Sequence, residues 1–345
     1  MDSISLIRPD DLHLHLRNGD ALASVVGDTA RQFARAIIMP NLKPPVTTVR
    51  QAEAYREEIL SCLPESSDFQ PLMTLYLTDN TAISEIKEIA NNEHVYAIKY
   101  YPAGATTNSD HGVSNIEKVY PQLECMMDLS IPLLIHGEVT NPDVDIFDRE
   151  KVFIEQMLLP LTGRFDKLRI VLEHITTSDA VEFVKNGSDS LAATITAHHL
   201  IQNRNALFQN GLRPHNYCLP VLKRETHRQA LLDVVASGHS RFFLGTDSAP
   251  HSRETKESAC GCAGVYSAHN AIELYASVFE SLGALDKLEA FASLNGADFY
   301  GLPRNIGKIT LEKNDWVIPE SFAFADSEIV PFMAGETCHW KLTQT

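Results

Sequence analysis

The sequence predicts an α/β protein, a (β/α)8 TIM barrel with a short C-terminal appendage. Eight short apolar runs bounded by turn residues recur along the chain, segments with helical periodicity separate most of them, and 345 residues suit such a barrel. Alternating strands and helices favour parallel pairing, and near-continuous apolar strands indicate a sheet covered on both faces. No Gly-x-Gly-x-x-Gly follows a predicted strand, which argues against a dinucleotide-binding fold. We expect one domain over residues 1–345.

The predicted elements follow one another in a regular order. The strands are expected at 11–16, 35–40, 71–77, 95–101, 131–136, 168–174, 191–196 and 241–247. The helices between them are expected at 48–63, 82–92, 114–129, 148–165, 177–186 and 226–237. Two further helices are expected at 270–283 and 287–301, and the tail from about residue 305 is interpreted as the appendage.

Charge and composition exclude several classes of partner. Lys and Arg number 29 against 45 Asp and Glu, so the net charge of −16 disfavours nucleic acid and anionic membranes. No apolar run approaches the roughly 18 residues of a membrane span, and no signal-like segment begins the chain, so we expect a cytoplasmic protein. The six cysteines are scattered as in a reduced enzyme, and Cys260 and Cys262 are interpreted as loop cysteines.

The stretch DLHLHLR, residues 11 to 17, places two histidines two positions apart in the first predicted strand. Strand alternation predicts that Asp11, His13, His15 and Arg17 share one face. Two imidazoles on one face can chelate a transition-metal ion. The alternative interpretation is a half-buried strand in which the histidines only form hydrogen bonds with the protein or with water. An Arg17 guanidinium on this face would suit recognition of a carboxylate.

Further polar residues fall where the other predicted strands end. They are Asn41, Lys99, His136, His174 and Asp247. In this barrel class the active site lies at the carboxyl ends of the strands, so these side chains are expected to converge. His136 and Asp247 each have a structural alternative as a strand-end or turn residue, but a lysine inside VYAIKYY must find a partner. Imidazole and carboxylate ligands suit Zn²⁺, and two ions with one shared ligand fit the count.

At these residues the sequence resembles the amidohydrolase superfamily and, within it, the dihydroorotase family of the short bacterial type. The resemblance runs nearly end to end. It rests on RPDDLHLHLRNGD, IIMPNLKPPVTT, AIKYYPAGATTNSDHGV, PLLIHGEVT, DIFDRE, EHITT, NYCLPVLKR, FLGTDSAPH and KESACGCAG.

The resemblance implies a role for each site residue. His13, His15 and Asp247 would bind the more buried of two Zn²⁺ ions, His136 and His174 would bind the second, and an N6-carboxylated Lys99 would bridge them. Arg17, Asn41 and His251 would hold the substrate carboxylate, the backbone of Leu219 and Ala263 would read the ring amides, and Thr106 and Thr107 would lie in a mobile loop. His198 and His199 are expected to be supporting residues. Leu12 departs from the family's aromatic residue and is expected to face away from the metals.

The implied activity is reversible hydrolysis of the cyclic amide of dihydroorotate to N-carbamoyl-L-aspartate in pyrimidine biosynthesis. Asp247 would take a proton from the attacking water and pass it to the leaving ring nitrogen. The alternative is a cyclic amidohydrolase of the hydantoinase, dihydropyrimidinase or allantoinase type, whose substrates lack the ring carboxylate. A barrel without catalytic activity is a further alternative, but every expected ligand position is filled. The resemblance also implies a homodimer with a small-molecule substrate.

Overall fold

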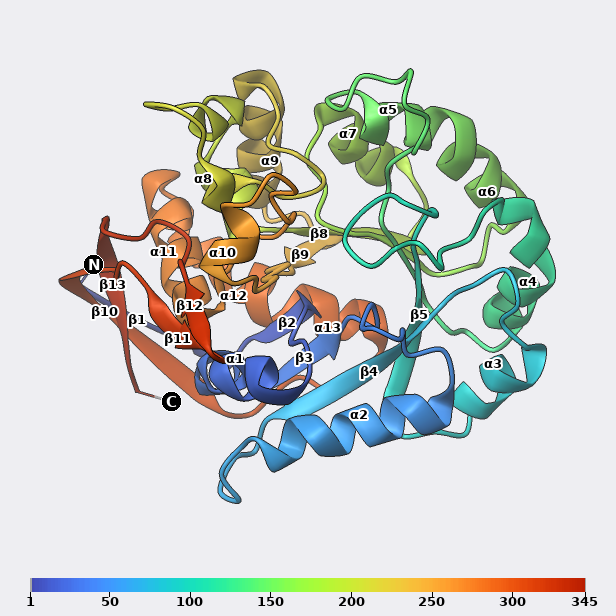
Figure 1. Cartoon of the computed structure of the whole chain (residues 1–345), viewed down its shortest axis with the longest axis horizontal. Helices are drawn as coiled ribbons and strands as arrows, with labels where there is room; N and C mark the ends of the chain where they lie inside the picture. Colours follow the sequence, from blue (N-terminus) through green and yellow to red (C-terminus); the bar gives the residue numbers. More distant parts are fainter. Residues whose placement is uncertain (1, 345) are drawn as a thin grey trace.

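The computed structural model describes residues 2–344 and contains an eight-stranded parallel sheet (Figure 1). Its strands are β2 (Asp10–Leu14), β3 (Arg35–Ile38), β4 (Gln70–Tyr76), β5 (Val95–Tyr100), β6 (Leu133–Ile135), β7 (Ile170–Leu172), β8 (Leu191–Ile195) and β9 (Phe242–Leu244). Their order in the sheet is their order in the chain. All eight predicted strands are confirmed, and the fold is the predicted barrel.

The barrel is closed by backbone hydrogen bonds between the first and last strands at the end that carries the site. The amide of Asp247 donates to the carbonyl of His13 over 2.9 Å, and the amide of His15 donates to Ser248 over 3.1 Å. The segment after β9 is thereby held beside the end of β2, so closure itself brings Asp247 next to the two histidines.

Helices surround the sheet, as alternation of strands and helices predicts. They are α1 (Gly19–Gln32), α2 (Val49–Ser61), α3 (Ile83–Ile89), α4 (Tyr120–Asp128), α5 (Arg149–Phe153), α6 (Leu159–Arg164), α7 (Ser178–Asn186), α8 (Ala197–Ile201), α9 (Glu225–Ser237), α10 (Arg253–Lys256), α11 (Ala271–Ser281), α12 (Leu285–Glu289) and α13 (Asn295–Tyr300). The predicted helices at 148–165 and 287–301 each contain a π-helical turn, at Ile154–Leu158 and Ala290–Leu294. Helix α1 was not among the predicted helices.

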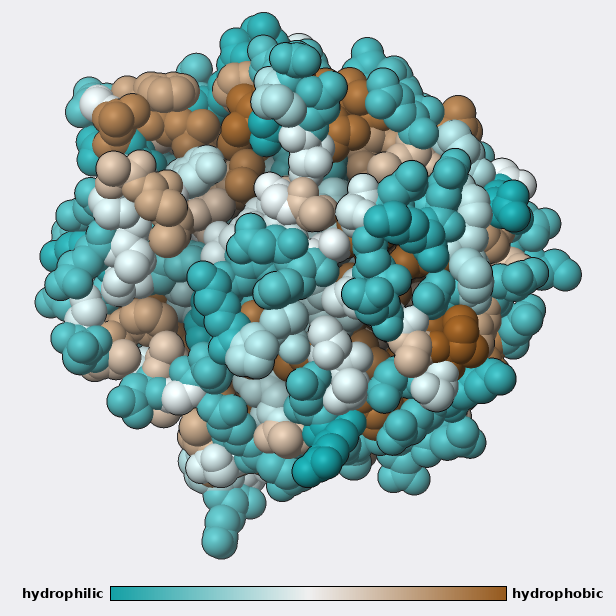
Figure 2. Space-filling view, turned by 45° about the vertical axis from the view of Figure 1, so that its right-hand side comes forward, coloured by the Kyte–Doolittle hydropathy of each residue, from teal (hydrophilic) through white to brown (hydrophobic). Residues whose placement is uncertain are grey.

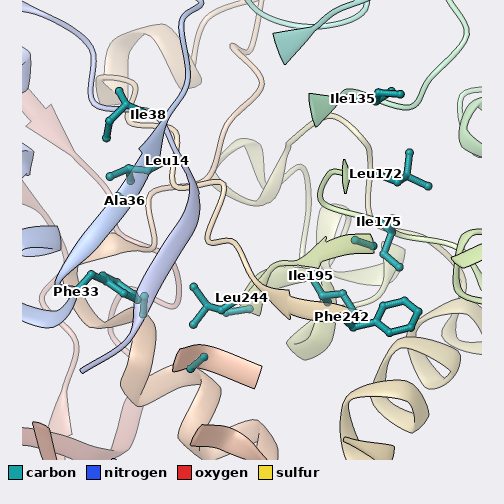
Figure 3. Packing of buried hydrophobic residues seen from close by; sticks show 14 of the residues in the cluster. Leu14, Phe33, Ala36, Ile38, Ile135, Leu172, Ile175, Ile195, Phe242 and Leu244 are labelled. Carbon is teal, nitrogen blue, oxygen red and sulfur yellow. The ribbon is translucent and has the colours of Figure 1, made fainter. Parts of the chain in front are cut away.

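Two apolar cores lie on the two faces of the strands. The larger lies between strands and helices and includes Leu14, Ala36, Ile38 and Leu244, several of which Figure 3 shows from close by. The smaller fills the barrel. It contains Leu12, Ile37, Met39, Leu72, Ala97, Leu134, Val171, Ala192, Phe243 and Tyr300. Because Tyr300 belongs to α13, this helix packs against the inner core.

A β-bulge in β2 corrects the predicted alternation. Asp11 pairs with Ala36 and Leu14 pairs with Ile38, so Leu12 and His13 together oppose Ile37. Leu12 therefore belongs to the inner core, below His13, and the prediction that it faces away from the site was wrong. Asp11 lies opposite an outward-facing alanine, so the prediction that it shares a face with His13 was also wrong.

Two glycines accommodate the side chains that the bulge turns inward. A Cβ on Gly245 would lie 3.0 Å from the Cβ of His13 and 2.8 Å from that of Thr194. A Cβ on Gly296 in α13 would lie 1.9 Å from Cδ1 of Leu12. Only a residue without a side chain fits at Gly296 unless Leu12 moves, and at Gly245 unless both Thr194 and His13 move.

The appendage includes the beginning of the chain as well as its end. Strand β1 (Ser3–Ile7) pairs antiparallel with β10 (Lys308–Val317), which pairs with β13 (Thr337–Gln344), and β11 (Phe322–Phe324) pairs with β12 (Ser327–Ile329). The sequence indicated the tail but not β1. Within residues 2–344, no helix has the length and apolar character needed to cross a membrane. The face in Figure 2 is mainly hydrophilic with scattered apolar patches.

Candidate active site

The carboxyl ends of the strands bring the predicted site residues around one cavity. Its lining includes His13, His15, Arg17, Asn41, Thr106, Thr107, His136, His174, Leu219, Asp247 and Ala263, and also Tyr101, Cys218, Ala249 and Gly264, which were not predicted. Two predicted residues are not in the lining: Lys99 is buried in β5, and His251 contacts Arg17 and Ala263. Parallel strands end at one edge of the sheet, and this is why residues far apart in sequence meet there.

Three potential metal ligands at β2 and β9 lie at the spacing of a zinc site. Nε2 of His13 and Nε2 of His15 are 3.4 Å apart, and Oδ1 of Asp247 lies 3.3 Å from the first and 3.1 Å from the second. Ligand atoms of a tetrahedral zinc ion, with Zn–N bonds of about 2.0–2.1 Å, are about 3.3 Å apart. This donor set therefore fits a zinc ion.

Hydrogen bonds behind the two imidazoles leave the correct nitrogens free for a metal. Nδ1 of His13 donates to Oε2 of Glu173 over 2.8 Å, and Nδ1 of His15 donates to Oδ1 of Asn41 over 2.8 Å. The amide of Asn41 is oriented by its Nδ2 group, which donates to the carbonyl of Thr107. Both Nε2 atoms consequently keep a lone pair toward Asp247. Glu173 was not predicted, although its position beside a strand-end histidine was a signal.

Asp247 is fixed from the outer side of the barrel. The carboxylate of Asp11 accepts hydrogen bonds from the amide and hydroxyl of Thr246, at 2.9 and 2.6 Å. Asp247 itself has φ of +46°, a left-handed backbone conformation that this anchoring maintains. Burial acts to raise the pKa of Asp247, but its close contacts with the imidazoles of His13 and His15 hold that pKa well below its usual value. Asp247 is therefore an ionised carboxylate.

The second half of the site contains buried polar atoms that the protein leaves unpaired. Nε2 of His136 donates to Glu138 over 2.9 Å, so its Nδ1 is free. Among residues 2–344, Nδ1 of His174 and Nζ of Lys99 have no hydrogen-bond partner. Burial lowers the pKa of Lys99 to about 8, against the attraction of Glu173 and Asp247. A buried atom of this kind is costly unless another group binds it.

The two halves are joined by a histidine row, which we define as His15, His13, His174 and His136. Successive ring centroids are 5.3, 4.9 and 4.8 Å apart. His174 has φ of +41°, so its ring is presented from a strained backbone at the end of β7. Burial lowers the pKa of His174 well below its usual value, and the imidazole is neutral, as a metal ligand must be.

A cationic group lies at the rim of the cavity. Nε of Arg17 donates to the carbonyl of Pro250 over 2.9 Å, and its Nη2 lies 3.0 Å from Nε2 of His251. Burial, and then the Arg17 charge, lower the pKa of His251 to about 2, so this imidazole is neutral. A guanidinium has five N–H groups, and these contacts leave several of them for a ligand.

The loop that contains Thr106 and Thr107 also lines the cavity. The hydroxyl of Thr107 donates to the carbonyl of Ala263 over 3.2 Å, and Asn108 donates to the carbonyl of Asn41 over 2.9 Å. The loop therefore bridges the segments after β3 and after β9.

A second group of potential metal ligands, His198, His199 and Cys218, lies beside the cavity. Nδ1 of His199 is 2.7 Å from the hydroxyl of Thr196, and Nε2 is 3.1 Å from the carbonyl of Pro220, so both nitrogens are used. Burial raises the pKa of the Cys218 thiol to about 12, which keeps it protonated. These contacts support a structural role for His199 in holding the segment that contains Leu219.

The barrel and the ligands at its strand ends are those of a metal-dependent hydrolase. Residues 4–318 match the model of the amidohydrolase family. A dihydroorotase of Cupriavidus necator is 61% identical over 338 residues, 98% of each chain. The dihydroorotase structure of Campylobacter jejuni has a TM-score of 0.91 at 36% identity and covers 100% of this chain and 98% of its own. That of Saccharomyces cerevisiae, in complex with 5-fluoroorotic acid, has a TM-score of 0.90 at 33% identity and covers 100% and 99%. The chain belongs to the amidohydrolase family and, within it, to the dihydroorotases.

Proposed function

We propose that this chain catalyses the reversible hydrolysis of the cyclic amide of dihydroorotate to N-carbamoyl-L-aspartate with two zinc ions bound. The observation that carries the proposal is the position of the Arg17 and His251 pair at the rim of a cavity whose floor is His13, His15 and Asp247. A cation at the rim and potential metal ligands below it suit a ring that bears a carboxylate at one end and a scissile amide at the other.

Asp247 is the group that moves the proton. Its carboxylate lines the cavity 3.3 and 3.1 Å from the two imidazoles that would hold a metal, a position from which it would accept a proton from the attacking water. The same carboxyl then donates that proton to the ring nitrogen, which is otherwise a poor leaving group. Zinc, when bound, would polarise the scissile carbonyl and lower the pKa of the attacking water. Thr107, on its loop over Ala263, helps to exclude bulk water.

Lys99 is proposed to carry a carbamate that bridges the two ions. Complete burial and the absence of a hydrogen-bond partner within residues 2–344 support this role. Lowering of its pKa to about 8 raises the fraction of neutral amine, the form that reacts with CO₂. The resulting anion would also neutralise positive charge beside His136 and His174.

The ring carboxylate separates this function from that of hydantoinases and allantoinases. Arg17 and Asn41, which line the cavity, and His251, which lies beside Arg17, are proposed to bind it. The complex of the yeast dihydroorotase with 5-fluoroorotic acid supports a carboxylate-bearing ligand. The homodimer and the cytoplasmic location stay predictions.

The decisive experiment measures hydrolysis of L-dihydroorotate, hydantoin and allantoin by zinc-reconstituted protein before and after chelation. We expect turnover of dihydroorotate alone, with loss on chelation and recovery on addition of zinc. Turnover of a ring without a carboxylate would contradict the substrate assignment, and turnover that survives complete metal removal would contradict the zinc assignment.

A further inference from the structure

A buried lysine outside the predicted site holds together two segments of the cavity wall. Nζ of Lys256, the last residue of α10, donates to the carbonyls of Tyr217, Cys262 and Gly264 at 2.8, 2.8 and 2.7 Å. An ammonium group has three protons, so these three bonds use all of them. The carbonyls belong to two separate loops, one ending at Leu219 and the other containing Ala263.

These two loops form a platform, which we define as residues 217–219 and 262–264. The amide of Gly264 also donates to the carbonyl of Tyr217 over 3.0 Å, so the loops are in direct contact. The carbonyl of Ala263 in turn accepts hydrogen bonds from His251 and from Thr107. One backbone segment therefore supports both the rim histidine and the loop over the cavity.

The platform is closely packed against the segment after β9, and the Lys256 ammonium group is buried beside it without a carboxylate partner among the described residues. A Cβ on Gly264 would lie 2.7 Å from the carbonyl oxygen of Ala249, so the backbone passes close to the segment after β9. Lys256 is only 3% exposed and forms no ion pair with a carboxylate in the part of the chain that the structure describes. Dipoles of three carbonyls, and not an opposite charge, stabilise this cation.

We propose that Lys256 is a positioning residue for substrate recognition: its three hydrogen bonds set the spacing between the backbone of Leu219 and that of Ala263. The proposal rests on the proposed function, in which these two backbone segments bind the ring amides. A planar guanidinium cannot direct three N–H groups at the same three carbonyls, so arginine is not equivalent here.

The test compares Lys256→Met with Lys223→Met in zinc-loaded protein. Lys223 is a matched control because it is also buried, at 4% exposure, but its Nζ donates to one carbonyl, that of Val221. For Lys256→Met we expect KM for dihydroorotate to rise about tenfold or more, kcat to fall less, and zinc content to stay at the wild-type value. For Lys223→Met we expect a lower melting temperature with KM within twofold.

Binding of orotate, measured by calorimetry, supplies a readout that does not depend on turnover. We expect the Kd of Lys256→Met to rise by the same factor as KM, and Lys256→Arg not to restore it. If Lys256→Met fails to fold, Lys256→Gln, which keeps two donors, is expected to give a smaller rise. Unchanged KM and Kd in a folded Lys256 variant, or equal changes in the Lys223 control, would overturn the proposal. Wild-type protein that neither binds orotate nor hydrolyses dihydroorotate would instead refute the proposed function.

Discussion

The two halves of the site differ in how the protein supports their side chains. At the ends of β2 and β9, other residues of the chain hold His13, His15 and Asp247 in place through hydrogen bonds. On β5 and after β7, side-chain nitrogens of Lys99 and His174 have no such hydrogen bond among residues 2–344. Glu173 and Asn41 orient the first two imidazoles, and Asp11 anchors the segment that contains Asp247. In the other half, Nζ of Lys99 and Nδ1 of His174 are buried without a partner among residues 2–344. One half of the site is therefore preorganised by the chain, whereas the other keeps buried polar atoms that a bound group would have to satisfy.

Asp247→Asn should have the largest effect on activity, because it removes the ionised carboxylate from the preorganised half while keeping its shape. We expect kcat to fall about 10³-fold or more, since a positioned general base contributes about 10²–10⁴-fold and a metal ligand is weakened as well. Steady-state kinetics measures this loss, and circular dichroism checks that the fold is retained. A variant with more than a tenth of wild-type kcat would contradict the proton-transfer role.

Lys99→Ala tests the difference between the halves directly. We expect loss of most activity and of one zinc ion per chain, with the ion at His13, His15 and Asp247 retained, because that group is complete without Lys99. Metal analysis after gel filtration counts the ions. Small carboxylic acids should restore part of the activity by replacing the carbamate; full activity without them would disprove the bridging role.

Arg17→Met should affect substrate binding and leave both halves of the metal site intact. Loss of charge-assisted hydrogen bonds to a carboxylate is expected to raise KM about tenfold to a hundredfold. Arg253→Met is the control, since Arg253 is on the neighbouring α10 but pairs with Glu328 at the surface. Equal loss of zinc and of substrate affinity in Arg17→Met would indicate a structural role instead.

Glu173→Gln and Glu138→Gln test whether each half of the site binds its own zinc ion. Each removes the carboxylate behind one histidine, His13 in the first case and His136 in the second. We expect about a tenfold to a hundredfold weaker zinc affinity in each variant, at a different ion of the pair. Competitive chelation, followed ion by ion, measures the affinities; loss of the same ion in both variants would contradict the assignment.

Gly296→Ala should have the smallest effect on activity but a measurable one on stability. Its new Cβ meets Leu12, which the bulge turns inward below His13, so we expect the free energy of unfolding to fall by about 1–3 kcal/mol. Adding Leu12→Ala should relieve the clash, so the effects of the two substitutions should be non-additive in urea denaturation. Strict additivity would show that the two side chains do not meet.

Local patterns along the chain were sufficient for most of the fold and for the histidine row. Alternating apolar runs predicted all eight strands of the barrel, and the position of His136, His174 and Asp247 at strand ends predicted their convergence. These features depend on periodicity and on parallel strands ending at one edge, both of which are visible in sequence.

Tertiary structure decided what depends on contacts between distant residues. The bulge that turns Leu12 inward depends on the neighbouring strand β3. Three other features join residues about 160 to 300 positions apart: the hydrogen bond of Glu173 with His13, that of Asp11 with Thr246, and the pairing of β1 with β10. No local pattern encodes such a partner, because a carboxylate or an apolar strand fits many environments equally well. Packing against the rest of the barrel selects one of them, and at Lys256 the same packing determines which three carbonyls surround a buried cation.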